Sequence, residues 1–324
     1  MSSFNQIPSS INQEISDQTS KYADCAGYQS ATYAHSFSEH GILQHLDSCK
    51  GWVISRQIPT TSYRDAIGLY PLFCCQNWNS LIRDIKALSN DLVSVCLVPD
   101  PFGNYTDDLL KEAFDYVRPY KTRYITELSR SPDKFVSNHH RKYAEKGFKV
   151  LDIDVCERPE DHLDEWINLY SHTCQKHRIT GMAAFSREAF RLQLSVPGVV
   201  MFRAKHNGEP VAIHIWMTNN RVGYGHLAGH RSDVYELNAS YALYWYALHW
   251  FHNKIDHLDL GSVSGITPNE GDGLSFFKRG WSTETRVSLF CEKVLNADSY
   301  TELLQTVPRH QGHYFPAYRT PRIT

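Results

Sequence analysis

The order of strands and helices expected in the second half of the chain restricts its fold more than any other feature. Hydrophobic periodicity there predicts a strand, two helices, three antiparallel strands, a helix, a strand, a short helix and a last strand. The pair Asn207-Gly208 marks a tight hairpin between two of these strands. Such an order favours a mixed sheet flanked by helices. The expected ranges are 149–155, 159–176, 186–194, 199–206, 211–218, 222–230, 239–252, 255–260, 274–280 and 285–291.

The first half of the chain shows a less regular alternation, and the fold class is therefore α/β (α+β). The division expected along the chain is a poorly ordered segment at 1–40, a first half at 41–130, a second half at 131–295, and a tail at 296–324 that packs on the first half or stays free. Strands are expected at 52–56, 67–73, 92–98 and 123–128, and helices at 77–88 and 107–116.

Composition excludes some classes of protein. The 324 residues carry a formal net charge of −2, which argues against a protein whose whole surface binds nucleic acid but leaves room for a local basic patch. The eight cysteines form no Cys-x-x-Cys pair, which indicates reduced thiols in a cytoplasmic protein. No metal site is expected, because His226 and His230 would lie about 13 Å apart on one strand. No membrane span is expected, since no window is apolar over roughly 18 residues.

The segment 259–281, DLGSVSGITPNEGDGLSFFKRGW, combines a glycine-rich loop with a compact cationic end. Glycine permits a close approach of the backbone to a ligand. We expect Phe276 and Phe277 to anchor the segment in a core, while Lys278 and Arg279 face a cleft that takes an anionic or polarised substrate. The alternative is a surface loop that ends in a half-buried helix with solvated cations.

The predicted strand 221–230, RVGYGHLAGH, carries side chains that suit proton transfer. Strict alternation would place Tyr224, His226 and His230 on one face and three glycines on the other. Tyr224 or His226 could then position or deprotonate an amine. The alternative is that both side chains pack and form hydrogen bonds in a core.

A basic helix is expected between Ser131, a good N-cap, and Gly147, a natural stop. Six Lys or Arg lie between residues 130 and 149, with only two acids. Arg141 and Lys142 could therefore hold a phosphate of a tRNA or nucleotide. An ordinary solvated helix is the alternative.

Together these pieces resemble the FemAB-type branch of the GNAT superfamily of N-acetyltransferases and the related BioF2-like acetyltransferase domain, over about residues 136–289. The resemblance rests on VSNHHRKYAEKGFKV (136–150), FRAKHNGEPVAIHIWM (202–217), LDLGS (258–262) and GLSFFKRGW (273–281). It implies two GNAT-like halves, each a mixed, mostly antiparallel sheet flanked by helices, and a transfer of an acyl or aminoacyl group to a primary amine. In that family the lysine that matches Lys278 is linked to the acyl donor and to the charge that develops during transfer.

These implications leave the donor open. Aminoacyl-tRNA is one candidate, and acyl-CoA or an acyl-carrier protein is another; no tightly bound cofactor is expected. The usual glycine turn that holds coenzyme A is absent from 230–238, HRSDVYELN. The acceptor would be a small-molecule or peptide amine. A catalytically silent GNAT-like binding module is the alternative from another class. The expected catalytic residues are Lys278, His226 and Tyr224, and the expected substrate-binding residues are Phe277, Arg279, Asp259, Trp281, Arg141 and Lys142.

Overall fold

The computed structural model describes residues 25–88, 91–263, 273–305 and 314–319. The glycine-rich loop at 264–272 and the first 24 residues of the segment expected to be poorly ordered lie outside the described residues. Residues 27–40 differ from that expectation. They form η2 (Gly27–Gln29), α2 (Ala31–His35) and η3 (Ser38–His40), and they bury Tyr28, Tyr33 and Phe37. Aromatic side chains supply the burial that composition alone did not reveal.

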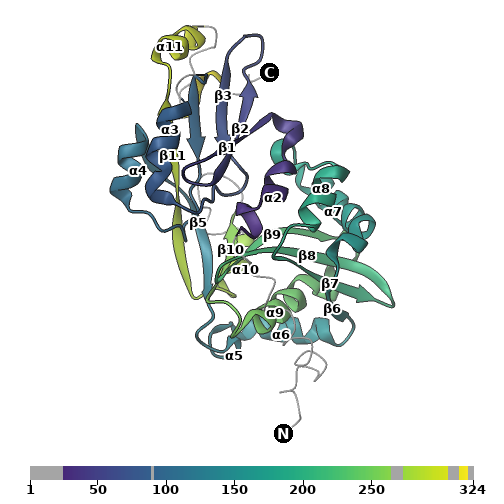
Figure 1. Ribbon diagram of the computed structural model, residues 1–324. Helices are drawn as coiled ribbons and strands as arrows, with labels where there is room; N and C mark the ends of the chain where they lie inside the picture. Colours follow the sequence, from purple (N-terminus) through teal and green to yellow (C-terminus); the bar gives the residue numbers. More distant parts are fainter. Residues whose placement is uncertain (1–24, 89–90, 264–272, 306–313, 320–324) are drawn as a thin grey trace.

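One continuous sheet of 11 strands runs through the described part of the molecule, in the order β1-β2-β3-β4-β11-β5-β10-β9-β8-β7-β6 (Figure 1). Neighbouring strands are antiparallel except for β3 with β4 and β9 with β10. The strands are β1 (Ile42–Leu46), β2 (Gly51–Gln57), β3 (Arg64–Gly68), β4 (Ser94–Leu97), β5 (Tyr116–Glu127), β6 (Asp152–Cys156), β7 (Val199–His206), β8 (Glu209–Asn219), β9 (Val222–His230), β10 (His257–Ser262) and β11 (Glu284–Val294).

Each half follows the same succession, which confirms the expected fold. In the second half β6 and two helices, at residues 163–177 and 187–194, come first. In each half an antiparallel meander (β1–β3, or β7–β9) then leads through a helix to a parallel strand (β4 or β10), and through a short helix to a last strand (β5 or β11). The two last strands are exchanged, because β5 pairs with β10 of the second half and β11 pairs with β4 of the first. The halves are therefore joined at the centre of the sheet by β5 and β11, which also pair with each other.

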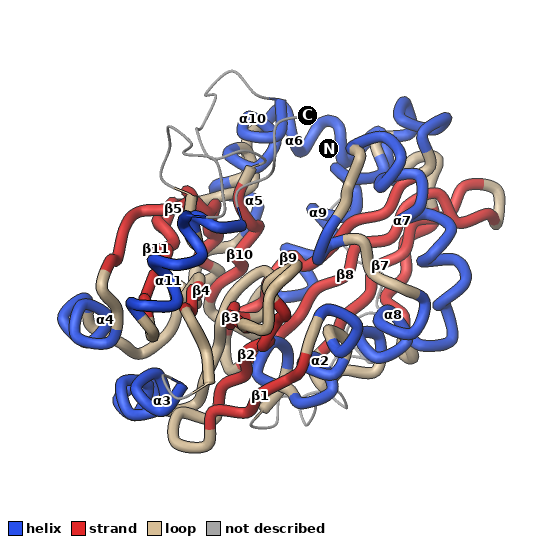
Figure 2. Tube along the Cα trace, turned by 90° about the horizontal axis from the view of Figure 1, so that it is seen from above, coloured by secondary structure: helices blue, strands red, loops and turns tan. Residues whose placement is uncertain are grey.

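Helices cover both faces of the sheet. In the second half α7, α8 and α2 lie on one face and α9 with α6 on the other, as Figure 1 shows. In the first half α3 and α4 lie side by side next to the strands (Figure 2). The helices are α3 (Leu81–Ala87), α4 (Asp107–Ala113), α5 (Pro132–Phe135), α6 (Asn138–Phe148), α7 (Leu163–His177), α8 (Arg187–Leu194), α9 (Ala239–Phe251), α10 (Gly273–Arg279) and α11 (Ala297–Gln305), with the 3-10 turns η4 (Trp78–Ser80), η6 (Pro159–His162), η7 (Gly181–Ala183), η8 (Ser232–Leu237) and η9 (Ala317–Arg319). In the part of the chain that the structure describes, none of the helices is long and apolar enough to cross a membrane.

The hydrophobic core on the α7 face spans both halves. It contains Ile54 and Leu72 of the first half together with Trp166 and Ile215 of the second. This shared core and the continuous sheet mean that the chain does not divide physically at residue 130. The described part of the tail also lies against the first half, where the Tyr318 hydroxyl hydrogen-bonds the Ser94 hydroxyl at 2.7 Å.

Some predicted elements differ in detail from the structure. Strand β1 was not predicted, because its five residues are partly exposed and show little apolar alternation. The predicted strand 67–73 is β3, displaced toward the N-terminus. The predicted basic helix is two helices, because Val136 has extended backbone angles and Ser137 starts a new helix by accepting a hydrogen bond from the His140 N–H.

Candidate active site

The strands β9 and β10 are paired only over their first residues. The register runs from Val222 with His257 to Tyr224 with Asp259, after which β9 and β10 have no further pairs, although β9 continues to residue 230 and β10 to residue 262. Gly261, in the part of β10 that no longer pairs with β9, has a φ of +81°, a conformation that favours glycine. Ligands of open α/β sheets bind at the carboxyl ends of such diverging strands.

A buried ion pair lies at this divergence. The Arg123 Nε of β5 donates to the Asp259 carboxylate of β10 at 2.6 Å, and the two side chains are 7% and 0% exposed. The other Asp259 oxygen accepts the Gly261 N–H at 2.8 Å, which fixes the turn of the backbone. Burial alone would lower the pKa of Arg123, but the negative charge of Asp259 and its hydrogen bond act in the opposite direction. The pKa of the guanidinium is raised as a result. Asp259 was expected to bind substrate; here its carboxylate pairs with Arg123 and the Gly261 N–H, and its role in binding substrate stays a prediction.

Lys278 of α10 also lies beside Gly261. Its Nζ donates to the Ser262 carbonyl at 2.7 Å, and a Cβ added to Gly261 would stand 3.1 Å from that nitrogen. The residue is only 8% exposed. Burial, and next the charge of Arg123, lower the pKa of Lys278 to about 7, although Asp259 acts in the opposite direction. An ammonium held at this pKa changes its charge within the neutral range.

The basic helix α6 fixes the position of α10. The His140 ring donates through Nε2 to the Phe277 carbonyl at 2.9 Å, while its Nδ1 accepts from the Ser137 hydroxyl at 2.7 Å. A Cβ on Gly280 would stand 2.1 Å from a His140 ring atom, so only glycine fits there. Burial lowers the pKa of His140 to about 4, which keeps the ring neutral and able to make both bonds.

The side chains of α10 point differently from the sequence-based expectation. Phe277 packs against Tyr241, as an anchor should, but Phe276 is 51% exposed. Lys278 is buried, whereas Arg279 is exposed and lines a shallow pocket of about 470 Å³ together with hydroxyl side chains such as Thr122. The helical period explains the difference, since positions 275 and 278 share the inner face. Trp281 is fully buried and belongs to the core on the α9 face.

Tyr224 and His226 are both buried on the α7 face of β9. The expected alternation fails because a bulge lies between them and His230: Ile215 pairs with Leu227 and Trp216 with Gly225, so no residue of β8 lies opposite His226. His230 therefore points to the α9 face, where Ser240 lies 2.8 Å from its Nε2.

The ring of His226 is held between two side chains. Its Nδ1 lies 3.2 Å from the Tyr28 hydroxyl, and its Nε2 lies 3.2 Å from the Gln193 side-chain oxygen. Burial lowers the pKa of His226 to about 3, so the ring is neutral and a weak proton acceptor at neutral pH. Its catalytic role stays a prediction, and the contacts found here are those of a core residue.

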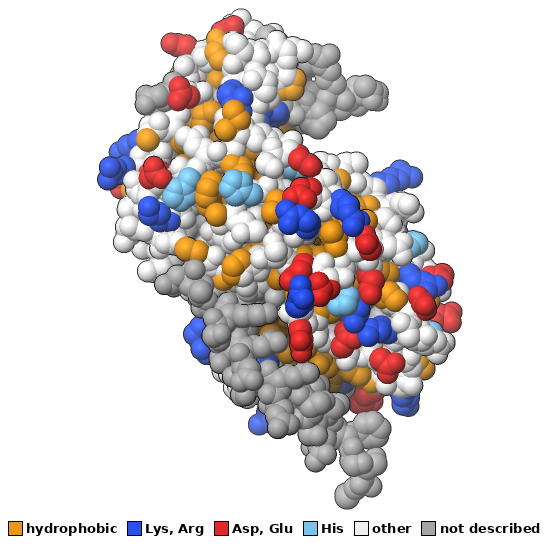
Figure 3. All heavy atoms as spheres, turned by 45° about the vertical axis from the view of Figure 1, so that its right-hand side comes forward, with side chains coloured by type: hydrophobic (Ala, Val, Ile, Leu, Met, Phe, Trp, Pro, Cys, Tyr) orange, Lys and Arg blue, Asp and Glu red, His pale blue; other side chains and the backbone are white. Residues whose placement is uncertain are grey.

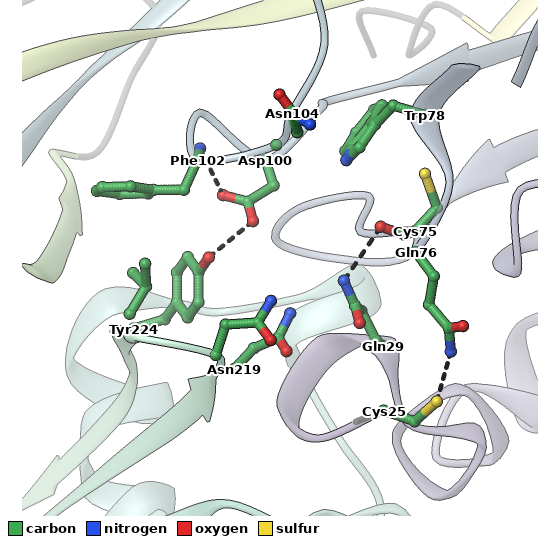
Figure 4. Close-up of a pocket in the computed structure, with 13 residues that line it drawn as sticks. Cys25, Gln29, Cys75, Gln76, Trp78, Asp100, Phe102, Asn104, Asn219 and Tyr224 are labelled. Carbon is green, nitrogen blue, oxygen red and sulfur yellow. Dashed lines mark hydrogen bonds between the residues drawn. The ribbon is translucent and has the colours of Figure 1, made fainter. Parts of the chain in front are cut away.

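Tyr224 lines a pocket of about 420 Å³ near the first residues of β9. Its hydroxyl donates to the Asp100 carboxylate at 2.7 Å, and burial raises its pKa well above the usual range (Figure 4). Phe102, Asn219 and Gln29 line the same pocket. This hydroxyl is thus a hydrogen-bond donor in the structure rather than a free base.

The two cations proposed to bind phosphate lie on α6. Arg141 hydrogen-bonds the Asn138 side chain and the Asp133 carbonyl, and Lys142 is exposed. A different face, over α7, α8 and β7, carries cations and anions side by side, as in the pairs Arg187–Asp164 and Arg203–Glu165 (Figure 3). Interleaved charges of this kind give no extended positive surface. Among the described residues no group of three or more His, Cys, Asp or Glu side chains could hold a metal ion.

Arg123, Asp100 and Asn219 were not among the site residues expected from the sequence. Arg123 begins an apolar strand pattern, and Asp100 lies in the turn PDPFGNY, so their local sequence indicated structure rather than a site. An arginine at the start of an apolar run was the one available signal, because a charge that becomes buried with such a run needs a partner.

Comparisons with known proteins agree with this architecture. Residues 134–279 match the model of the acetyltransferase (GNAT) domain family, which confirms the resemblance to GNAT proteins seen in the sequence. No curated protein matches the chain by sequence.

Solved structures show the same fold over nearly the whole chain. FemX has 11% identity and a TM-score of 0.63, over 90% of this chain and 98% of that one. The C-terminal domain of a putative lysylphosphatidylglycerol synthetase from Agrobacterium fabrum has 12% identity and a TM-score of 0.60, over 91% and 96%. A protein named L-PGS from Bacillus licheniformis has 14% identity and a TM-score of 0.56, over 88% and 98%. At these identities the likeness concerns the fold.

Proposed function

We propose that this chain, which carries a GNAT acetyltransferase domain at residues 134–279 within a FemX-like fold, is an N-acyltransferase. The observation that carries the proposal is the buried Lys278 at the divergence of β9 and β10, backed by the Arg123–Asp259 pair. A buried lysine is costly to the fold and is a residue type that active sites use.

The proposed reaction begins when the lone pair of a primary amine attacks the acyl carbonyl of an activated donor. A C–N bond forms, and the carbonyl electrons move to oxygen to give a tetrahedral oxyanion. The C–O or C–S bond to the leaving group then breaks, and the proton lost by the amine passes through solvent to the leaving oxygen or sulfur. Lys278 donates to the oxyanion, because its Nζ has three protons and the Ser262 carbonyl takes one of them.

The Arg123–Asp259 pair is proposed to set the electrostatics of this step. Asp259 keeps a negative charge close to Lys278 and so favours the ammonium form, while Arg123 opposes it. Their balance, together with burial, holds the pKa of Lys278 at about 7. A donor of this kind is worth about 3 kcal/mol to a transition state.

Aminoacyl-tRNA is the donor that the chain favours over acyl-CoA. The β9–α9 junction, where GNAT enzymes hold coenzyme A, is filled by the 3-10 turn η8 and has no glycine between residues 230 and 238. Arg279 with the hydroxyls of its pocket, and Arg141 with Lys142 on α6, are the proposed contacts for donor phosphates. Acyl-CoA or an acyl-carrier protein is the alternative donor. The acceptor is a small-molecule or peptide amine.

The test compares aminoacyl-tRNA and acetyl-CoA as donors toward a panel of primary amines, with mass spectrometry of the amide product. Lys278→Met should lower the turnover number by roughly 10²- to 10³-fold with either donor, because the loss falls on the transition state. Lys142→Met, an exposed lysine, is the matched control and should change the Michaelis constant for the tRNA donor alone. Undiminished turnover in a folded Lys278→Met protein would contradict the proposal, and absence of turnover with every donor would favour a silent binding module.

A further inference from the structure

The pocket that Tyr224 lines contains a buried carboxylate without a cationic partner. We propose that this pocket binds a small polar molecule through its primary ammonium group, with Asp100 as the anionic contact. The inference does not depend on the acyl transfer proposed above, because it concerns recognition by Asp100 in a pocket that Lys278 does not line.

Asp100 differs from the other buried acids among the described residues. Asp65, Asp259 and Glu292 each pair with an arginine, and Asp84 accepts three backbone N–H bonds from Ser48 and Cys49. Asp100 is 5% exposed and has no ion-pair partner in the part of the chain that the structure describes. A buried carboxylate of this kind is costly unless a cation or enough donors compensate it.

The donors that Asp100 has do not compensate its burial. One oxygen accepts the Tyr224 hydroxyl at 2.7 Å and the Cys74 thiol at 3.6 Å, and the other accepts the Phe102 N–H at 3.0 Å. Burial raises the pKa of Asp100, although the bonds from Tyr224 and Phe102 and the charge of Arg123 act in the opposite direction. The pKa of Asp84, by contrast, is lowered, because its backbone bonds outweigh its burial. A carboxylate has about four lone-pair directions, so Asp100 can accept further donors from a ligand.

The rest of the pocket is lined by amides and aromatic rings (Figure 4). Asn219 is 5% exposed, yet its side-chain amide has no hydrogen-bond partner among the described residues, and Figure 4 shows it on the same side of the space as Tyr224. Gln29 donates one amide proton to the Cys75 carbonyl at 3.1 Å, which leaves its oxygen for another donor. Trp78 lies across the pocket from these amides and offers an apolar surface.

These groups define the class of ligand. Neutral amides recognise hydroxyl and amide groups, the tryptophan covers an apolar ring or chain, and the carboxylate selects an ammonium. The cavity of about 420 Å³ has the size of a small-molecule site. An amino sugar or an amino alcohol has this combination of groups.

The experiment measures binding of D-glucosamine, ethanolamine and their neutral counterparts D-glucose and ethylene glycol to the full chain by ligand-observed NMR titration. Each amine should bind at least tenfold more tightly than its neutral counterpart, and Asp100→Asn should remove this preference. Equal affinity of the amine and neutral members, or no binding of either amine at millimolar concentration, would overturn the proposal.

Asp100→Asn could disturb the fold, because the carboxylate accepts bonds from Tyr224 and Phe102. Circular dichroism and thermal unfolding check this. Asn219→Leu leaves the carboxylate in place and occupies pocket volume, so it should weaken both amines at least fivefold. Retention of full amine affinity in a folded Asn219→Leu protein would likewise overturn the assignment.

Discussion

Replacing Lys278 by methionine should stabilise the fold while it lowers the rate of acyl transfer. The lysine is 8% exposed, and its ammonium contacts one carbonyl oxygen rather than a carboxylate. Methionine has a similar length and flexibility and needs no hydrogen-bond partner. The exchange therefore removes a buried charge without opening a large cavity.

The magnitude follows from the pKa of Lys278. Burial lowers it to about 7, whereas a lysine in an unfolded chain titrates near 10.4. The difference corresponds to about 5 kcal/mol against the fold at pH 6, where both states are protonated. Between pH 7 and 10.4 the unfolded chain binds a proton that the folded chain does not, so the stability of the native sequence rises with pH. About 2 kcal/mol of the penalty remains at pH 9.

Urea unfolding of both proteins at pH 6 and pH 9 measures this effect. The advantage of Lys278→Met in free energy of unfolding should be about 3 kcal/mol larger at pH 6 than at pH 9. Lys142→Met on the exposed side of α6 controls for the loss of a lysine as such and should change stability by less than about 0.5 kcal/mol. An advantage that does not vary with pH, or a methionine variant that is less stable at pH 6, would refute the reasoning.

Two further predictions concern the residues that support the site. Gly280→Ala should destabilise the protein by at least about 2 kcal/mol in chemical unfolding, because the new Cβ would stand 2.1 Å from a ring atom of His140. Gly273→Ala is the control, because no described atom lies within 4 Å of its new Cβ, and it should cost less than half as much. Equal costs would contradict this packing argument. His226→Gln should reduce the loss of stability between pH 7 and pH 5 by about 2 kcal/mol. The buried ring has a pKa of about 3, whereas a histidine in the unfolded chain takes up a proton below about pH 6.5, so acid favours the unfolded state of the native sequence. If the variant keeps the same acid sensitivity in urea unfolding, another group is responsible.

Local patterns predicted most elements of the second half correctly. Apolar periods, Ser186 as an N-cap and the hairpin at Asn207-Gly208 are properties of neighbouring residues, and the structure contains α8 and the β7–β8 hairpin where they indicate. The family resemblance of the same region, including GLSFFKRGW, also follows from contiguous residues. Lys278 could be selected in this way, because the cationic end of α10 is visible in the sequence.

The environment of each site residue depends on contacts that the sequence does not display. Alternation predicted one face for Tyr224, His226 and His230, but the bulge at His226 arises from the register with β8 and turns His230 to the other face. Likewise Phe276 was expected in the core and Lys278 at a cleft, but Phe276 is exposed and Lys278 is buried. The period of a short helix defines two faces, but it does not say which face points inward.

The sequence alone determined the fold class and the succession of elements in the second half, and it singled out Lys278, whose catalytic role stays a prediction. Only the tertiary structure decided that β5 and β11 are exchanged between the halves and that Arg123 meets Asp259, 136 residues away in the chain. The reason is physical. Propensity, capping and periodicity act over a few residues, whereas burial and the pairing of charges depend on which distant strands become neighbours, and these contacts set the pKa of Lys278.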